Sequence, residues 1–115
     1  MGDGWRARAA LEEMRRAWPD LTVDQGLALL ALVDLPEGER LTMREIQGAL
    51  GGSPSAAMRA AARLGSAQYG FFGGKGPGLV EQWFDPERNE RSVALTPKGA
   101  ELARRVRWKL GGAGA

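Results

Sequence analysis

The sequence contains neither cysteine nor histidine. Without cysteine the chain has no disulfide framework, no thiolate metal site and no thiol nucleophile. Without histidine it lacks the commonest general base, most catalytic triads and most zinc chemistry. Together the two absences remove most of the familiar routes to an enzyme or a metal site.

The carboxylates, which could still support catalysis, are not grouped. Glu12 and Glu13 fall on the polar side of an expected helix, and Glu87 and Glu90 fall in an expected turn. No arrangement offers two chemical roles, and no spacing suits an oxygen cage for a metal ion. We therefore expect no enzyme activity, no catalytic residue, no metal and no cofactor.

Long hydrophobic runs are missing as well. The longest, Leu27–Val33, is far too short to span a bilayer, and we expect no signal peptide before it. The expectation is a cytoplasmic protein with no membrane partner.

What the chain does have is an uneven distribution of charge. Its 115 residues, 43% hydrophobic and 26% charged, suffice for one globular domain with a modest core. The formal net charge is only +2. Residues 1–58 hold six Lys/Arg against nine Asp/Glu, a net −3, whereas residues 59–115 hold ten against five, a net +5. A basic second half favours an anionic partner such as nucleic acid.

The stretch 41–64, LTMREIQGALGGSPSAAMRAAARL, predicts two short helices joined by a tight turn. Thr42 and Glu45 form a capping box that starts the first helix. Gly51-Gly52 ends that helix, because a positive φ costs glycine little. Ser53 then caps the second helix, which opens with a proline. The pattern is typical of a helix-turn-helix.

The second helix, expected over residues 54–67, has two different faces. A small inward face, suited to close packing, is formed by Ala57, Ala60, Ala61 and Leu64. The outward face carries Ser55, Ala56, Met58, Arg59, Ala62 and Arg63. Outward arginines on such a helix suit nucleic-acid contact, although solvated surface charges would give the same pattern.

Periodicity, capping and turn residues predict the other elements. Helices are expected over residues 4–18, 23–33 and 97–110, with Leu27, Leu29 and Leu30 facing inward. Strands at Leu79–Phe84 and Arg91–Leu95, joined by a polar turn, form a β-hairpin. We therefore expect one domain over residues 1–110, mainly α with a small β-hairpin (α-α-α-α-β-β-α), and a disordered tail over residues 111–115. A helix-turn-helix followed directly by a hairpin is a winged helix.

At these positions the sequence resembles the MarR family of winged helix-turn-helix transcription regulators. The stretch 41–64 resembles the family's central segment, and GLVEQWFDPERNERSVALTPKGAEL, residues 78–102, resembles its wing and the start of the following helix. The wing signature is the more specific part, with Gly78-Leu79-Val80, Asp85-Pro86, an arginine-containing tip, Leu95-Thr96 and Gly99. The resemblance covers roughly residues 22–105.

The resemblance implies a transcription regulator that binds specific sequences of double-stranded DNA. The helix 54–67 would enter the major groove, and the wing, 79–95, would lie on the backbone or in the minor groove. The residues implied in DNA contact are Ser53, Ser55, Ala56, Met58, Arg59, Arg63, Arg88, Asn89 and Arg91. Asp85 matches a family position whose carboxylate holds a wing arginine, with Arg91 as the candidate partner; otherwise Asp85 is a plain turn residue.

The sequence departs from the family pattern in three ways. About ten extra residues before the wing, around 69–77, carry aromatics that stack on bases, plug the surface of a partner or cover the small core. The wing is about one residue short, which leaves the Asp85–Arg91 pairing open. Members of the family dimerise through long terminal helices, which also frame a pocket for small effectors, whereas the terminal helices of this chain are short. A homodimer through these helices is still expected, with Trp5 and Trp108 as an apolar patch, and a small-molecule effector is left open.

A second function is compatible with the same pattern. A winged helix can also serve as a protein-interaction module that docks on transcription or replication machinery. The weak net charge, the small residues on the outward face of 54–67 and the aromatic insertion favour this alternative.

Overall fold

A computed structural model describes residues 4–65 and 76–111. Most of the predicted insertion around 69–77 and most of the predicted tail, 111–115, lie outside these residues. The elements are α1 (Gly4–Ala17), α2 (Val23–Val33), β1 (Leu41–Thr42), α3 (Met43–Leu50), α4 (Pro54–Leu64), β2 (Val80–Asp85), β3 (Glu90–Leu95) and α5 (Pro97–Lys109).

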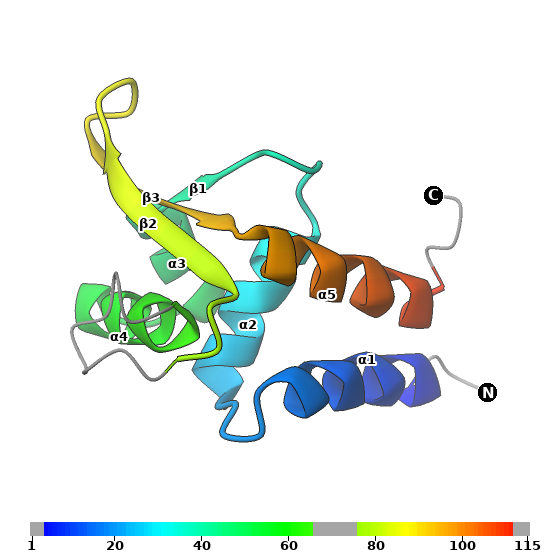
Figure 1. Cartoon of the computed structure of the whole chain (residues 1–115). Helices are drawn as coiled ribbons and strands as arrows, with labels where there is room; N and C mark the ends of the chain where they lie inside the picture. The colour runs from blue at the N-terminus through cyan, green and yellow to red at the C-terminus, as the bar shows by residue number, and fades with distance from the viewer. Residues whose placement is uncertain (1–3, 66–75, 112–115) are drawn as a thin grey trace.

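The elements divide the molecule into two ends (Figure 1). α1 and α5 lie side by side at one end. α4 lies at the other end, and the β2–β3 hairpin projects from the molecule on that side. α2 packs against α3, α4 and α5, so it connects the two ends. Among the described residues, no helix is both long and apolar enough to cross a membrane.

The helix-turn-helix forms through the predicted caps. The Thr42 hydroxyl accepts the Glu45 N–H at 3.1 Å, and the Glu45 carboxylate accepts the Thr42 N–H at 2.9 Å. Gly51, at φ 68°, ends α3 in the left-handed region. The Ser53 hydroxyl accepts the Ala56 N–H at 3.2 Å and starts α4. Each cap satisfies backbone donors or acceptors that the helix ends leave unpaired.

α4 is shorter than the predicted 54–67. It ends at Leu64, because Gly65 has an extended backbone and residues 76–79 pass across the end of the helix. The N–H groups of Gly78 and Leu79 donate to the carbonyl oxygens of Gly65 and Leu64 at 3.1 and 2.8 Å. Ala62, expected on the outward face, is buried at this end of the helix.

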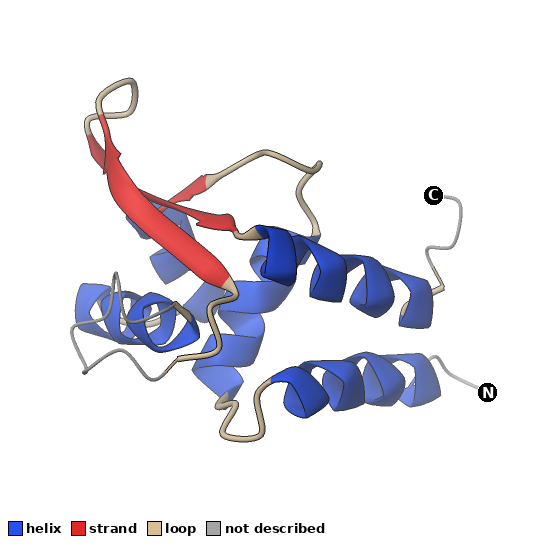
Figure 2. Ribbon diagram, in the orientation of Figure 1, coloured by secondary structure: helices blue, strands red, loops and turns tan. Residues whose placement is uncertain are grey.

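The sheet has one strand more than the predicted hairpin (Figure 2). β1 pairs antiparallel with β3, Leu41 opposite Val93 and Thr42 opposite Ser92, which gives the strand order β1-β3-β2. Two residues are too few to show alternation in a sequence, and Thr42 also carries the capping signal of α3. The short strand joins the helix-turn-helix directly to the wing.

The core is one hydrophobic cluster to which all five helices and the sheet contribute. Its fully buried members include Met14, Leu29, Ile46, Leu64, Val93 and Val106. Leu27, expected to face inward, is exposed, and Leu30 is only partly buried. α2 is apolar nearly all round, so its periodicity does not select the side that packs.

Candidate nucleic-acid interface

The outward side of α4 presents most of the predicted contact residues to solvent. Ser55, Arg59 and Arg63 are exposed, Met58 is 45% exposed, and Ala56 is half-buried. Ala56, Arg59 and Arg63 line a shallow groove whose other wall is Thr22, Asp24 and Gln25 at the start of α2. Ser53 is exposed, but its hydroxyl already accepts the capping hydrogen bond.

The wing tip is a tight turn between β2 and β3. The Arg88 N–H donates to the Asp85 carbonyl oxygen at 3.2 Å. Asn89 then adopts φ 50°, a left-handed conformation that asparagine tolerates better than most residues. The exposed Asn89 side chain is thus carried at the far end of the hairpin.

The predicted wing arginines have partners within the fold. Arg88 Nη1 donates to Glu45 Oε1 of α3 at 2.9 Å, so its side chain turns back toward the helix-turn-helix. Arg91 Nε donates to Gln82 Oε1 on the neighbouring strand at 2.8 Å. Both arginines remain exposed, and 36% of the Arg88 side chain is accessible.

The predicted pairing of Asp85 with Arg91 is wrong. Arg91 stands opposite Phe84 in the ladder, and Asp85 stands opposite Glu90. Opposite residues point to the same face and successive residues to alternate faces, so Arg91 and Asp85 project from different faces of the ribbon. The partner of Asp85 is instead Arg40, in the loop before β1: Arg40 Nε donates to Asp85 Oδ2.

Asp85 is buried and fully hydrogen-bonded at the base of the tip. Besides Arg40, it accepts the Ser92 hydroxyl at 3.2 Å and the Glu87 N–H at 3.0 Å. The Arg40 hydrogen bond is the main reason why the pKa of Asp85 lies below its usual value; burial opposes it, and the Glu87 and Ser92 hydrogen bonds add to it. Asp85 is therefore a charged anchor and not a plain turn residue.

The sequence did not indicate the roles of Arg40 and Glu45 in holding the wing. Arg40 lies 45 positions from Asp85, and no local spacing signals such a pair. Glu45 was identified only as a helix cap, yet it also binds Arg88. The N–H of Thr42 is the largest cause of the lowered pKa of Glu45, and Arg88 lowers it further.

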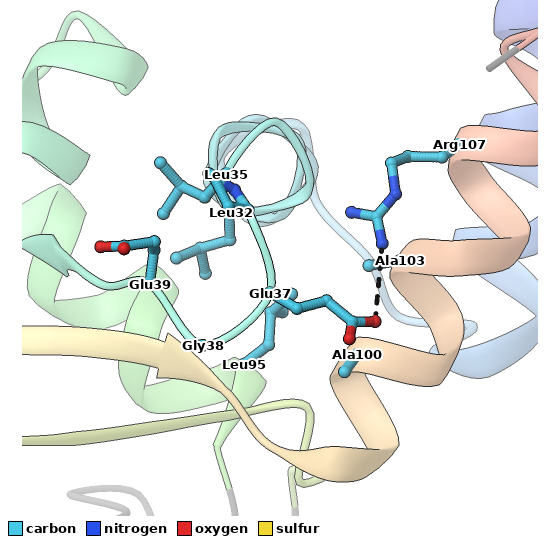
Figure 3. Close-up of a pocket in the computed structure, with 10 residues that line it drawn as sticks. Leu32, Leu35, Glu37, Gly38, Glu39, Leu95, Ala100, Ala103 and Arg107 are labelled. Atoms are coloured by element: carbon cyan, nitrogen blue, oxygen red, sulfur yellow. Dashed lines mark ion pairs between the residues drawn. The ribbon is translucent and has the colours of Figure 1, made fainter. Parts of the chain in front are cut away.

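A small cavity lies between the loop after α2 and the side of α5 (Figure 3). Leu32, Leu35, Leu95, Ala100 and Ala103 give it an apolar lining, and Glu37 and Arg107 stand at its edge. Its volume is about 40 Å³, room for a few water molecules. Within residues 4–65 and 76–111, no three Asp or Glu side chains are placed to hold a metal ion.

A helix-turn-helix whose second helix is exposed, joined through β1 to a projecting hairpin, defines a winged-helix protein. No protein-family profile and no curated protein sequence matches the chain. Solved structures do match the chain, at sequence identities of only 20–24%.

Three of these structures cover more than nine tenths of the chain. Rv1404 from Mycobacterium tuberculosis is 22% identical, with a TM-score of 0.65 over 94% of this chain and 66% of its own. The transcriptional regulator PcaV from Streptomyces coelicolor is 24% identical, with a TM-score of 0.57 over 96% and 76%. BpsR from Bordetella bronchiseptica, whose DNA binding is regulated by 6-hydroxynicotinic acid, is 20% identical, with a TM-score of 0.53 over 94% and 72%.

These similarities establish the fold. The chain has the MarR-type winged-helix fold, as the resemblance in its sequence implied. It spans about two thirds of the length of Rv1404.

Proposed function

We propose that the protein is a transcription regulator that binds specific sequences of double-stranded DNA, with α4 in the major groove and the wing on the adjacent backbone or minor groove. One observation carries this proposal. α4, whose outward residues Ser55, Met58 and Arg59 are exposed, and the projecting wing lie at the end of the molecule away from α1 and α5, an arrangement that would let one duplex meet both (Figure 1).

The residues on and beside α4 suit different DNA contacts because their side chains differ in chemistry. Arg59 suits bidentate contact with guanine, which is worth ~1–3 kcal/mol of discrimination. Met58 and Ala56 offer apolar contact to a thymine methyl group. Ser55 would face base edges, whereas Arg63 and the capping Ser53 would contact phosphates, and phosphate contacts fix the register of the protein on the duplex.

The wing supplies contacts that do not depend on base sequence. Asn89 and Arg91 are exposed and can donate to phosphate oxygens. Arg88 must exchange its bond to Glu45 for a phosphate. Because both states of Arg88 are ion pairs, this exchange makes its net contribution to affinity smaller than that of an arginine without such a partner.

Selection of bound sequences from a pool of random duplexes tests the proposal. Arg59→Ala should weaken binding to the selected sequence by about tenfold or more and affect random DNA much less. Arg88→Ala should weaken both alike, by a smaller factor. Arg104→Ala, an exposed arginine on α5, is the matched control and should change neither. Failure to enrich any sequence, or equal effects of all three substitutions, would contradict the proposal.

The proposal includes a cytoplasmic homodimer, assembled through the terminal helices and bound to a pseudo-palindromic sequence. Trp5 and Trp108 of those helices are 63% and 65% exposed, which favours a partner for this end. The proposal does not extend to a small-molecule effector.

The alternative function, a module that docks on another protein, has its own supporting observation. Phe84 on the wing is 58% exposed and Met58 on α4 is 45% exposed, so the same end of the molecule presents apolar side chains. A gel shift with random duplex at low salt separates the two functions. Even non-specific DNA binders associate at micromolar protein, so absence of retardation there would favour the protein partner.

A further inference from the structure

Arg40 occupies a junction between three parts of the fold. It directly precedes β1, which pairs with β3 of the wing, and Thr42 at the end of β1 is the N-cap of α3. The backbone at Arg40 is thus tied to the helix-turn-helix, while its guanidinium reaches the wing. It donates to Asp85 through Nε and to Glu87 Oε2 through Nη2, the latter at 3.0 Å.

The carboxylate that Arg40 holds controls the start of the wing-tip turn. Asp85 Oδ1 accepts the Glu87 N–H at 3.0 Å, and the Asp85 carbonyl oxygen accepts the Arg88 N–H at 3.2 Å. An aspartate that bonds the backbone two residues on fixes the course of a turn. The orientation of Asp85 therefore sets where the next residues, including Arg88 and Asn89, point.

Burial distinguishes this ion pair from the other contacts between the wing and the helix-turn-helix. Arg40 and Asp85 expose 25% and 4% of their side chains. The Arg88–Glu45 pair exposes 36% and 50%, and Arg44 in the Arg44–Glu90 pair exposes 84%. Exposed pairs are weakened by water and salt, whereas removal of one partner from a buried pair leaves an uncompensated charge.

We propose that Arg40 is the positioning residue of the wing: through Asp85 it fixes the wing-tip turn relative to α3 and α4. The role of this arrangement in DNA binding rests on the proposed function. With the tip fixed, α4 and the wing meet the duplex without first ordering the hairpin, and preorganisation of this kind improves affinity without any new contact. Arg40 itself need not touch DNA.

Amide hydrogen exchange tests the positioning role independently of DNA. Arg40→Gln should raise the exchange rates of the Glu87 and Arg88 amides by about tenfold or more, while the amides of Ile46 and Val106 in the core keep wild-type rates. Arg40→Lys retains a charge but only a point-like donor, so its effect should be intermediate. Arg104→Gln, which breaks the exposed ion pair between Arg104 of α5 and Glu37 of the loop after α2, should leave the wing amides unchanged.

A second measurement combines Arg40→Gln with Asp85→Asn. Once Asp85→Asn is present, adding Arg40→Gln should cause little further increase in exchange at the wing, because the two residues act as a unit. Unchanged wing amides in both Arg40 variants, or an equal increase at the wing and in the core, would overturn the proposal. If the Arg40→Gln variant does not fold, the exchange rates of the Arg40→Lys variant, compared with wild type, distinguish the same outcomes.

DNA affinity then separates this proposal from the proposed function. If the wild type binds a selected duplex, Arg40→Gln should raise the Kd by about tenfold while Arg104→Gln does not. An unchanged Kd beside a loosened wing would overturn the role of positioning in binding. If the wild type binds no duplex while the wing amides still respond selectively to Arg40→Gln, the proposed function fails and the positioning role is supported.

Discussion

At the scale of single residues, the wing depends on charges that come from outside it. Arg40, Arg44 and Glu45 precede the hairpin by about forty residues, and each binds a wing residue. Among the wing residues that these charges bind, Asp85 is held most firmly, because it is buried and accepts three hydrogen bonds. Because these hydrogen bonds favour the charged form of the carboxyl group, Asp85 stabilises the wing only while it is ionised.

The lowered pKa of Asp85 predicts a pH-dependent contribution to stability. A carboxylate whose pKa is lower in the folded than in the unfolded state stabilises the fold at pH values above its unfolded-state pKa, which is about 4. This stabilisation is lost as the pH falls through the folded-state pKa. Asp85→Asn should therefore lower the Tm by roughly 5 °C or more at pH 7. The difference from wild type should shrink as the pH falls below about 4.

Thermal unfolding followed by circular dichroism between pH 7 and pH 3 makes this measurement. Asp34→Asn is the control, because Asp34 is exposed and the chemical change is the same. A difference for Asp85→Asn that stays constant over this range would contradict the account.

The residues that the sequence could not predict are those with distant partners. The exposure of Ser55, Met58 and Arg59 follows from helical periodicity within one short segment. The Asp85–Arg40 pair instead depends on how a loop after α2 approaches the hairpin, which no local pattern encodes. The resemblance identified Asp85 as a position that holds an arginine, but only the strand register shows that Arg91 is on the wrong face.

At the scale of elements, capping residues predicted the helices better than periodicity did. Thr42 and Ser53 each cap the helix that the sequence assigned to them, and Thr22 and Thr96 likewise cap α2 and α5. Caps are local hydrogen bonds and can be recognised in a few residues. The side of α2 that packs, the length of α4 and the strand β1 depend on tertiary contacts, and these predictions were wrong or incomplete.

The two glycines of α3 and α5 give a prediction at this scale. A Cβ at Gly99, where α5 packs on the chain entering β2, would lie 1.9 Å from the Leu79 carbonyl oxygen, whereas a Cβ at Gly48 meets nothing within 4 Å. Gly99→Ala should therefore destabilise the protein by about 2 kcal/mol or more. Gly48→Ala should stabilise it by roughly 0.5–1 kcal/mol through helix propensity.

Urea unfolding of the two variants measures both free energies. The same chemical change should thus have opposite signs at two helical positions. A neutral effect of Gly99→Ala would show that α5 does not pack closely on the start of β2.

At the scale of the whole molecule, charge along the chain does not translate into charge on one surface. The second half is basic, but α5 folds back beside α1 and its arginines find acidic partners from the first half. Arg104 and Arg107 pair with Glu37, and Arg105 pairs with Glu13. The net +5 of residues 59–115 is therefore shared between the α4–wing end and the α1–α5 end.

The exposed tryptophans of the α1–α5 end predict self-association. Trp5→Ser combined with Trp108→Ser should weaken the proposed homodimer by about tenfold or more, because large aromatics dominate interface energies. Phe84→Ser, a similarly exposed aromatic on the wing, should leave the dimer unchanged. Sedimentation equilibrium measures the dissociation constants; a wild-type chain that is monomeric at all concentrations would contradict the prediction.

NMR can show whether one duplex contacts both α4 and the wing. Backbone amide shifts would be recorded while a selected duplex is added to the labelled protein. Large changes are expected at Ser55, Met58, Arg59 and Asn89, with little change along the outward side of α1. Changes confined to α1 and α5, or to α4 without the wing, would contradict it.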